Sequence, residues 1–325
     1  MRPIADPDVM LREMVGGRAG PRVVAIGGGH GLAQALRAVT HYAGVTHAVV
    51  TVADDGGSSG RLAPALAIPP PGDIRQCLIA LTPEDTVWRR LFEYRFDGAD
   101  VVGHSLGNLI IASLADLEGD FEAALRASER LLGSVGSVVP ASPQRLSLTA
   151  VIEGTPVHGQ VNIATSRGKL ESLAVLPPDA EASPSAVAAI QAADQIVLGP
   201  GSLFTSVVAT LLVPGLAEAV NGSGAQLVYV SNMMTQDGET LGMDCREHLE
   251  ALLSFTGLRS PTAIVANSEP IQVAAPLEAL QADPEIMQTY GVDTITRDLL
   301  DEGADWPRHD PAKLGEVLRQ LISDD

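Results

Sequence analysis

The sequence has few aromatic residues and little positive charge. Aromatic side chains make up 3% of the 325 residues, and 40 Asp and Glu residues against 21 Lys and Arg residues give a formal net charge of −19. Such a surface repels phosphate backbones and offers few rings on which bases can stack. We therefore expect neither nucleic acid nor an anionic membrane as a partner, whereas a small anion in a locally positive pocket fits this composition.

Cysteines and long apolar runs are also scarce. Cys77 and Cys245 form neither a disulfide framework nor a metal-ligand pattern, so we expect buried free thiols in a cytoplasmic protein. No apolar run approaches the roughly 20 residues that span a bilayer. Residues 1–20 are polar, lack the apolar core of a signal peptide and are predicted to form a flexible extension. Residues 21–325 are long enough to bury a large core, and we predict a single domain.

The most informative stretch is residues 49–61, VVTVADDGGSSGR. Its β-branched start predicts a buried strand, and the Gly and Ser residues that follow predict a loop. Asp54 and Asp55 would lie at the carboxyl end of this strand, where open α/β sheets bind their ligands. Ser58 and the main-chain N–H groups of the loop can donate hydrogen bonds to a ligand. A solvated turn is the alternative, although turns seldom need so many such residues in a row.

A second glycine-rich loop, GGGHG at 27–31, lies between a predicted strand and a helix predicted over Leu32–Val39. This order begins a dinucleotide-type unit, in which the helix N-terminus can hold a phosphate. Leu32 replaces the third glycine of G-x-G-x-x-G, while Asp54, 23 residues after Gly31, suits a ribose hydroxyl. A loop that serves only strand–helix packing is the alternative. The candidate phosphate-binding residues of the loop are Gly28, Gly29, His30 and Gly31.

Residues Gly103–Gly107, GHSLG, match the G-x-S-x-G pattern of a nucleophile elbow. This pattern would make Ser105 a hydrolase nucleophile, with His309 and an upstream Asp completing a triad. Asn108 argues against that interpretation. In an N-cap-like cluster, Ser105 and Asn108 would instead bind backbone N–H groups and an anion.

Between residues 133 and 177 the sequence changes to short segments in which apolar and polar residues alternate. The segments are Arg145–Ile152, Val157–Ala164 and Lys169–Leu176, and Gly and Pro turns separate them. They predict a small antiparallel insert in an otherwise parallel sheet. Because the insert has few convergent polar groups, we assign it to packing, to a lid or to oligomer contacts.

Helix–strand alternation then resumes, and each further predicted strand ends in small or polar residues. These are Gly201 and Ser202 after Gln195–Leu198, Asn232 after Gln226–Val230, and Asn267 after a last strand, Thr262–Ala266. The carboxyl ends of parallel strands lie on one edge, so these residues predict a nucleotide-sized cleft there. The predicted fold is a Rossmann-like, mostly parallel sheet with helices on both faces and a small antiparallel insert.

Six motifs between residues 22 and 267 form a specific set: VVAIGGGHGL (23–32), TVADDGGSSGRL (51–62), PPGDIRQCLIAL (70–81), GHSLGNLI (103–110), LGPGSLFTS (198–206) and SNMMTQDGET (231–240). Together they resemble the gluconeogenesis-factor (YvcK) family, relatives of the 2-phospho-L-lactate transferase CofD. The resemblance implies a Rossmann-like sheet that binds a nucleotide sugar, UDP-N-acetylglucosamine. It also implies a cytoplasmic role in cell shape and cell-wall precursor metabolism during gluconeogenic growth.

The resemblance also implies roles for individual residues. The phosphates would contact Gly28, Gly29, Gly31, Gly201 and Ser202, and the sugar and base would lie among Asp54, Asp55, His104, Asn108 and Asn232. His30 stands where the family usually has Thr. Arg308, in the segment WPRHD, is implied as a phosphate-pairing residue. Pro311 stands where relatives carry a phosphorylatable Thr, so regulation of that kind is not expected.

Three functions follow from these observations. The first is a regulator without catalytic residues that binds a UDP-sugar, needs no cofactor beyond Mg²⁺ accompanying the nucleotide, forms a homodimer and acts on unidentified protein partners. The second is a CofD-like transferase that joins a phosphorylated acid to an activated nucleotide, with Asp54 or Asp55 holding Mg²⁺. The third is a serine hydrolase built on Ser105.

Overall fold

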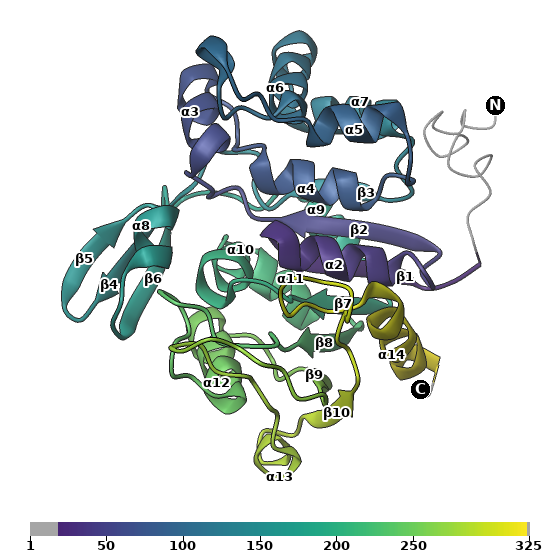
Figure 1. Ribbon diagram of the computed structural model, residues 1–325, viewed down its shortest axis with the longest axis vertical. Helices are drawn as coiled ribbons and strands as arrows, with labels where there is room; N and C mark the ends of the chain where they lie inside the picture. The colour runs from purple at the N-terminus through teal and green to yellow at the C-terminus, as the bar shows by residue number, and fades with distance from the viewer. Residues whose placement is uncertain (1–18, 324–325) are drawn as a thin grey trace.

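The computed structural model describes residues 19–323, so nearly all of the predicted extension over residues 1–20 lies outside the described residues. A seven-stranded parallel sheet crosses the molecule (Figure 1) in the order β10-β9-β8-β7-β1-β2-β3. Its strands are β1 (Arg22–Gly27), β2 (Val45–Val50), β3 (Ser137–Pro140), β7 (Gln195–Leu198), β8 (Gln226–Val230), β9 (Ala263–Asn267) and β10 (Asp293–Arg297).

The central strands are apolar because the sheet is covered on both faces. All four residues of β7 and all but the first residue of β1 are buried, as is usual for parallel strands between helical layers. The chain adds β2 and β3 on one side of β1 and β7 to β10 on the other. The strand order therefore reverses between β1 and β7, and this reversal marks the topological switch point of the sheet. The predicted Rossmann-like fold is confirmed.

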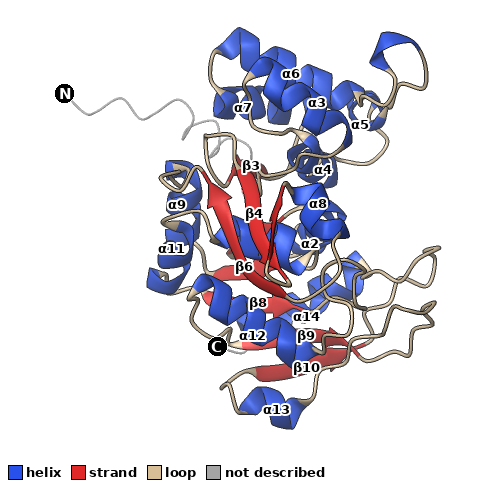
Figure 2. Ribbon diagram, turned by 90° about the vertical axis from the view of Figure 1, so that its left-hand side faces the viewer, coloured by secondary structure: helices blue, strands red, loops and turns tan. Residues whose placement is uncertain are grey.

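Helices cover both faces of the sheet (Figure 2). Helices α2, α4 and α14 lie on one face and α9 and α11 on the other, while α3, α5, α6 and α7 form a helical layer at the β3 edge (Figure 1). The helices are α2 (Gly29–Val39), α3 (Gly57–Leu66), α4 (Gly72–Ala80), α5 (Val87–Glu93), α6 (Leu106–Glu118), α7 (Phe121–Leu132), α8 (Gln160–Thr165), α9 (Pro184–Gln191), α10 (Ala209–Leu211), α11 (Leu216–Gly222), α12 (Cys245–Thr256), α13 (Pro284–Gln288) and α14 (Pro311–Ser323), with the short helices η1 (Ala99–Val101) and η2 (Leu203–Val208).

The insert is a three-stranded antiparallel sheet of β4 (Ser147–Ile152), β5 (Thr155–His158) and β6 (Leu170–Leu176), in the order β5-β4-β6. All three strands lie within the expected range of 133–177, whereas β3, also in that range, belongs to the main sheet. The prediction of a strand over Val157–Ala164 is largely wrong. Gly159, at φ +90°, ends β5, and α8 begins at the next residue.

Two other local predictions differ from the structure. The Gly-Ser stretch after Asp55 is not a loop throughout, because α3 begins at Gly57. The strand ending at Asn267 is not the last, since β10 follows and pairs with β9 in parallel. Cys77 and Cys245 are buried free thiols, as predicted.

Within residues 19–323, no single helix is long and apolar enough to cross a membrane. Leu203–Leu211 and Leu216–Gly222 reach the required length and composition only when counted together, and they are bent by 73°.

Candidate functional site

A pocket of about 740 Å³ opens at the carboxyl edge of the sheet, beside the switch point. Its size lies within the range of roughly 300–1,000 Å³ that is usual for small-molecule sites. The lining comes from the loops after β1, β2, β7 and β8, from the start of α8 and from the segment before α14. Predicted site residues that line the pocket are Gly28, Gly29, His30, Gly31, Asp54, Gly201, Ser202, Asn232 and Arg308.

Two glycine loops meet in the middle of this pocket. A Cβ atom added at Gly31 would lie 2.4 Å from the Pro200 carbonyl oxygen and 2.6 Å from Gly201 Cα. The loops after β1 and β7 therefore touch backbone to backbone. Asn232 fixes the second loop, because its Oδ1 accepts from Gly201 N–H at 3.0 Å and its Nδ2 donates to the Gly201 carbonyl at 2.8 Å. The amide of Asn232 is thus used to shape the loop.

The N-terminus of α2 is the stronger anion-binding element of the two loops. Its N-cap, Gly28, makes no side-chain cap hydrogen bond, and its first turn has no acidic residue. The Gly29 N–H donates to the Asp73 carboxylate, and the N–H groups that follow it in the first turn of this 11-residue helix can bind a phosphate. His30 lies in the same turn, where desolvation and the charges of Arg75 and Arg37 lower its pKa. The imidazole is therefore neutral at pH 7.

The second glycine loop is arranged differently. Ser202 precedes η2, but its hydroxyl donates to Gln236 Oε1 at 3.0 Å rather than capping the helix. The Glu239 carboxylate accepts from the N–H groups of Phe204 and Thr205 at 3.1 and 3.4 Å. The N-terminus of η2 therefore gives two N–H groups to a carboxylate of the protein, against one at α2, where Gly29 N–H donates to Asp73, and we assign phosphate binding to α2.

Two carboxylates, Asp54 and Asp73, face one end of the pocket. Burial and the negative charge of Asp54 raise the pKa of Asp73 to about 7, and burial also raises the pKa of Asp54. A Cβ atom at Gly72 would lie 2.6 Å from Asp54 Oδ2, and one at Gly28 would lie 2.5 Å from Asp73 Oδ2. Such a pair favours a cation or hydroxyl donors between its oxygens. Within residues 19–323, no group of three or more His, Cys, Asp or Glu side chains could hold a metal ion.

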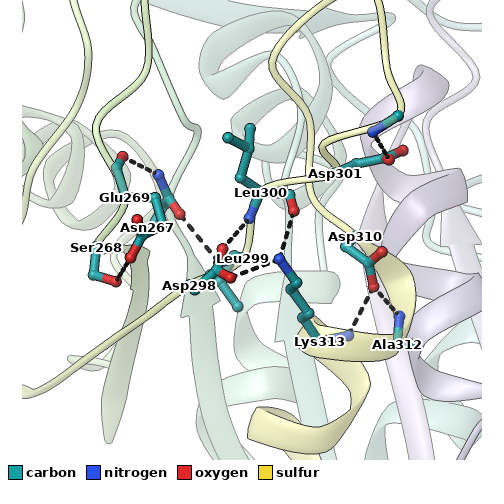
Figure 3. Close-up of polar contacts among 11 residues, drawn as sticks. Asn267, Ser268, Glu269, Asp298, Leu299, Leu300, Asp301, Asp310, Ala312 and Lys313 are labelled. Carbon is teal, nitrogen blue, oxygen red and sulfur yellow. Dashed lines mark hydrogen bonds and ion pairs between the residues drawn. The ribbon is translucent and has the colours of Figure 1, made fainter.

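Another part of the pocket wall comes from residues 298–310, here called the C-terminal strap. Leu300 pairs with His309 in an antiparallel bridge, and Arg308 Nε donates to Asp301 Oδ2 at 2.8 Å. The base of the strap is fixed by Lys313, whose Nζ donates to Asp298 Oδ2 at 2.6 Å and to the Leu300 carbonyl at 2.9 Å (Figure 3). The strap carries Trp306, Arg308 and His309 to the pocket.

The remaining predicted site residues lie outside this pocket. Asp55 accepts from the N–H groups of Gln160 and Val161 at 3.0 and 2.9 Å, so its carboxylate holds the start of α8. The others form a polar cluster between α3 and α6, in which Ser58 Oγ lies 3.0 Å from His104 Nδ1 and accepts from Asn108 Nδ2 at 3.1 Å. These residues lie close in sequence to pocket residues, and the sequence did not show that their side chains make packing contacts within the protein instead.

The nucleophile-elbow interpretation of Ser105 is wrong. Ser105 is fully buried, and its hydroxyl accepts from Asn108 N–H at 3.2 Å as the N-cap of α6. His309, the suggested base, instead lines the pocket on the C-terminal strap. A solvent-inaccessible hydroxyl used as a helix cap cannot attack a substrate.

Several pocket residues were not predicted as site residues from the sequence: Asp73, Gln160, Gln236 and Trp306. Asp73 is the acidic residue in the first turn of α4, where the helix dipole stabilises a negative charge, so its place in the sequence gave no signal specific to a ligand. Trp306 stands two residues before Arg308 and could have been included with it. Gln160 comes from the insert, and its position depends on the tertiary contact with Asp55.

The fold and the pocket define a Rossmann-like α/β protein with a candidate ligand site at its switch point. The family model described as 2-phospho-L-lactate transferase CofD matches residues 23–300. The gluconeogenesis factor of Halalkalibacterium halodurans is 40% identical over 305 residues, which cover 91% of this chain and 95% of that protein. The chain belongs to the gluconeogenesis factor family, which is related to CofD.

Two further comparisons support this family assignment. The gluconeogenesis factor of Bacillus subtilis is 38% identical over 313 residues, which cover 94% of this chain and 99% of that protein. The crystal structure of a UPF0052 family member from Bacillus halodurans superposes with a TM-score of 0.88 at 38% identity and covers 93% of this chain and 99% of that chain. The similarity therefore extends over nearly the whole of the described fold.

Proposed function

We propose that this protein is a cytoplasmic regulator that binds a nucleotide sugar of the UDP-N-acetylglucosamine type and links its level to cell shape and cell-wall precursor metabolism. The observation that carries this proposal is the meeting of the uncapped α2 N-terminus and the Gly201 loop inside one pocket of about 740 Å³. A diphosphate needs closely spaced N–H donors, and this junction supplies them without a bulky side chain.

The side chains around the junction suit the rest of such a ligand. Asp54 and Asp73 can accept hydrogen bonds from sugar hydroxyls, because a carboxylate offers two acceptor oxygens. Arg308 is 54% exposed at the pocket, and its guanidinium can exchange its bond to Asp301 for a phosphate oxygen. Arg308, which forms a surface ion pair in the free protein, would thus pair with a phosphate of the bound ligand.

Mg²⁺ fits this site as an ion that arrives with the nucleotide. Asp55 was one expected ligand, but its oxygens already accept two N–H groups of α8. Asp54 and Asp73 are the pair that would hold the ion, since Mg²⁺ commonly binds one or two carboxylates together with substrate phosphates. Bound there, the ion would neutralise charge on the diphosphate.

A CofD-like transferase is the second candidate, favoured by the match of the CofD family model to residues 23–300. The same Asp54–Asp73 pair would then hold the metal between the phosphates of an activated nucleotide. The names of the relatives, gluconeogenesis factors without a stated reaction, favour the regulator.

Thermal unfolding with UDP-N-acetylglucosamine, NAD or GTP, each with and without Mg²⁺, tests the proposal. At 100 times its Kd, a ligand stabilises the fold by about 2.7 kcal/mol, a rise in Tm of roughly 5 °C. We expect this rise with the UDP-sugar, a smaller one in Arg308→Gln, and a wild-type response in Arg90→Gln, an exposed arginine on α5 outside the pocket.

A larger rise with NAD or GTP than with the UDP-sugar would contradict the proposed ligand. Incubation with a phosphorylated hydroxy acid then separates the two candidates. Release of a mononucleotide would support the transferase, and an intact nucleotide sugar after prolonged incubation supports the regulator.

A further inference from the structure

The two ends of the pocket differ in chemistry. The end beside β2 presents the carboxylates of Asp54 and Asp73. The end beside β8 combines the apolar Met233 with the polar Gln236 and Asp237, and the strap adds the indole of Trp306. In the sheet order, β2 and β8 are separated by β1 and β7, a distance of roughly 14 Å at the usual spacing of neighbouring strands. The glycine loops that follow β1 and β7 lie between the two ends.

Building on the proposed function, we propose that the nucleobase stacks on Trp306 beneath the C-terminal strap, while the sugar lies at the Asp54–Asp73 end and the diphosphate crosses the glycine loops between them. In this orientation the strap recognises the base and the carboxylate pair recognises the sugar.

Trp306 is suited to this role by its position. It is 55% exposed, and it borders the pocket, in a chain with only 2 Trp residues. Two contacts hold the turn of the strap that carries the indole. They are the bridge between Leu300 and His309 and the ion pair between Asp301 and Arg308. An indole left half exposed beside a pocket offers a flat surface on which a base can stack.

His309, three residues after Trp306 in the strap, gives the second observation. Its side chain is 4% exposed and borders the pocket, and its Nε2 has no hydrogen-bond partner. The other ring nitrogen, Nδ1, bonds to the main chain of Ser231. Because the Ser231 N–H already donates to the Val265 carbonyl, the atom that bonds to Nδ1 is the Ser231 carbonyl oxygen.

This arrangement determines what His309 can bind. Burial lowers its pKa to about 4, so the ring is neutral at pH 7, with its proton on Nδ1 and a lone pair on Nε2. A buried acceptor without a partner costs free energy that a ligand donor can recover. The ring N–H of a uracil-type base is such a donor. Nε2 is covered in the free protein, so this contact forms when the strap shifts as the base enters.

The reverse direction would leave Trp306 without a base to stack on and His309 Nε2 without the ring N–H of a base. A pyrimidine base beside Asp54 and Asp73 could donate its ring N–H to one carboxylate, but its two carbonyl oxygens would then face the carboxylate pair. The strap end therefore suits the base better.

The test uses tryptophan fluorescence in the Trp88→Phe variant. Trp88 lies on α5 outside the pocket, so this variant keeps Trp306 as its only tryptophan. UDP and UDP-N-acetylglucosamine should both change the Trp306 emission, whereas N-acetylglucosamine 1-phosphate should leave it unchanged. Trp88→Phe itself should bind UDP as tightly as the wild type.

Affinities measured by calorimetry complete the test. Trp306→Ala should weaken UDP binding by roughly 5- to 150-fold, the range that stacking on one ring supplies, and Trp306→Phe should recover much of it. In the absence of Mg²⁺, Asp54→Asn should weaken UDP-N-acetylglucosamine more than UDP. Wild-type UDP affinity in Trp306→Ala would overturn the orientation while the proposed function stood. Failure of the wild type to bind any UDP compound would overturn both.

Discussion

Asp73 shows how a pocket carboxylate can weaken the free protein that carries it. Burial and the neighbouring Asp54 raise its pKa from 3.8 to about 7. Between those values the folded state holds a proton that the unfolded state has released, so stability falls as the pH rises from about 4 to 7. Above pH 7 the destabilisation is complete, because the folded protein must then carry the buried charge.

Asp73→Asn should therefore stabilise the free protein at alkaline pH. The neutral amide can still accept the N–H of Gly29, and it removes the repulsion from Asp54. We expect a gain on the order of 2 kcal/mol at pH 8 that shrinks steadily towards pH 5, measured by urea denaturation across this range. The exposed Asp116→Asn on α6 serves as the control and should follow the wild type at every pH. A gain that does not vary with pH would contradict the argument.

At the scale of residues, the sequence predicted that the segment after β2 carries an acid of the pocket. It did not show that Asp54 lines the pocket and Asp55 does not. Asp54 and Asp55 are adjacent after the same strand, and composition treats them alike. In the structure Asp54 lines the pocket while Asp55 binds α8, more than 100 residues further along the chain. Their separation depends on the path of the backbone after β2 and on a tertiary contact that no local pattern encodes.

At the scale of elements, the strand–glycine–helix pattern supported two interpretations, phosphate binding and close packing. The structure supports packing directly at Gly31, which touches Pro200 and Gly201. The first N–H of α2 donates to Asp73, and the N–H groups after it can bind an anion. The two uses are therefore compatible within one loop. The sequence could not show that the loop after β1 meets the loop after β7, because the contact joins segments about 170 residues apart.

Replacing Gly31 by Ala should separate these two loops. The added methyl group would lie 2.4 Å from the Pro200 carbonyl oxygen, which is main chain and cannot turn away. We expect a loss of roughly 1–3 kcal/mol in the free energy of unfolding and a weaker response to UDP-N-acetylglucosamine.

Gly222→Ala is the matched control for this prediction. Gly222 lies at the end of α11, and a Cβ atom there meets nothing within 4 Å. Its effect should be within about 0.5 kcal/mol or slightly stabilising. Urea denaturation of both variants measures the difference, and equal stabilities would show that the loops adapt to the methyl group.

The strap and β10 show where sequence patterns were least informative. The residues of β10, DTITR, include no fully buried side chain, and the strand lies at the edge of the sheet. Weak hydrophobic alternation of this kind does not distinguish an edge strand from a loop. The strap depends on Lys313 of α14 and on Asn267, whose Oδ1 accepts from the Leu299 N–H at 3.1 Å (Figure 3). The path of the strap is set by these tertiary contacts, which no local sequence pattern encodes.

At the scale of the whole molecule, the insert is a wall of the pocket rather than a separate accessory. Asp55 holds the first N–H groups of α8, and Gln160 reaches Thr205 Oγ1 at 3.4 Å. Arg167 pairs with Asp237 at 2.8 Å on the surface. These contacts connect the insert to the segments after β2, β7 and β8. Ligand binding and docking of the insert should consequently stabilise each other.

Asp55→Asn tests this coupling. The two oxygens of Asp55 accept from two adjacent N–H groups, whereas an amide has one oxygen and would turn its NH₂ group towards the other N–H. We expect a loss of about 1 kcal/mol, as for a lost helix cap, and faster hydrogen exchange confined to residues 147–176.

The exchange pattern distinguishes a local effect from general destabilisation. Strands β1 and β7 should exchange as slowly as in the wild type, and Asp179→Asn, an exposed change ahead of α9, should alter neither region. UDP-N-acetylglucosamine should slow exchange of the insert in Asp55→Asn, because a ligand touching Gln160 favours the docked state. Uniformly faster exchange throughout the sheet would mean that Asp55 supports the whole fold, and unchanged exchange in the insert would mean that other contacts suffice to hold it.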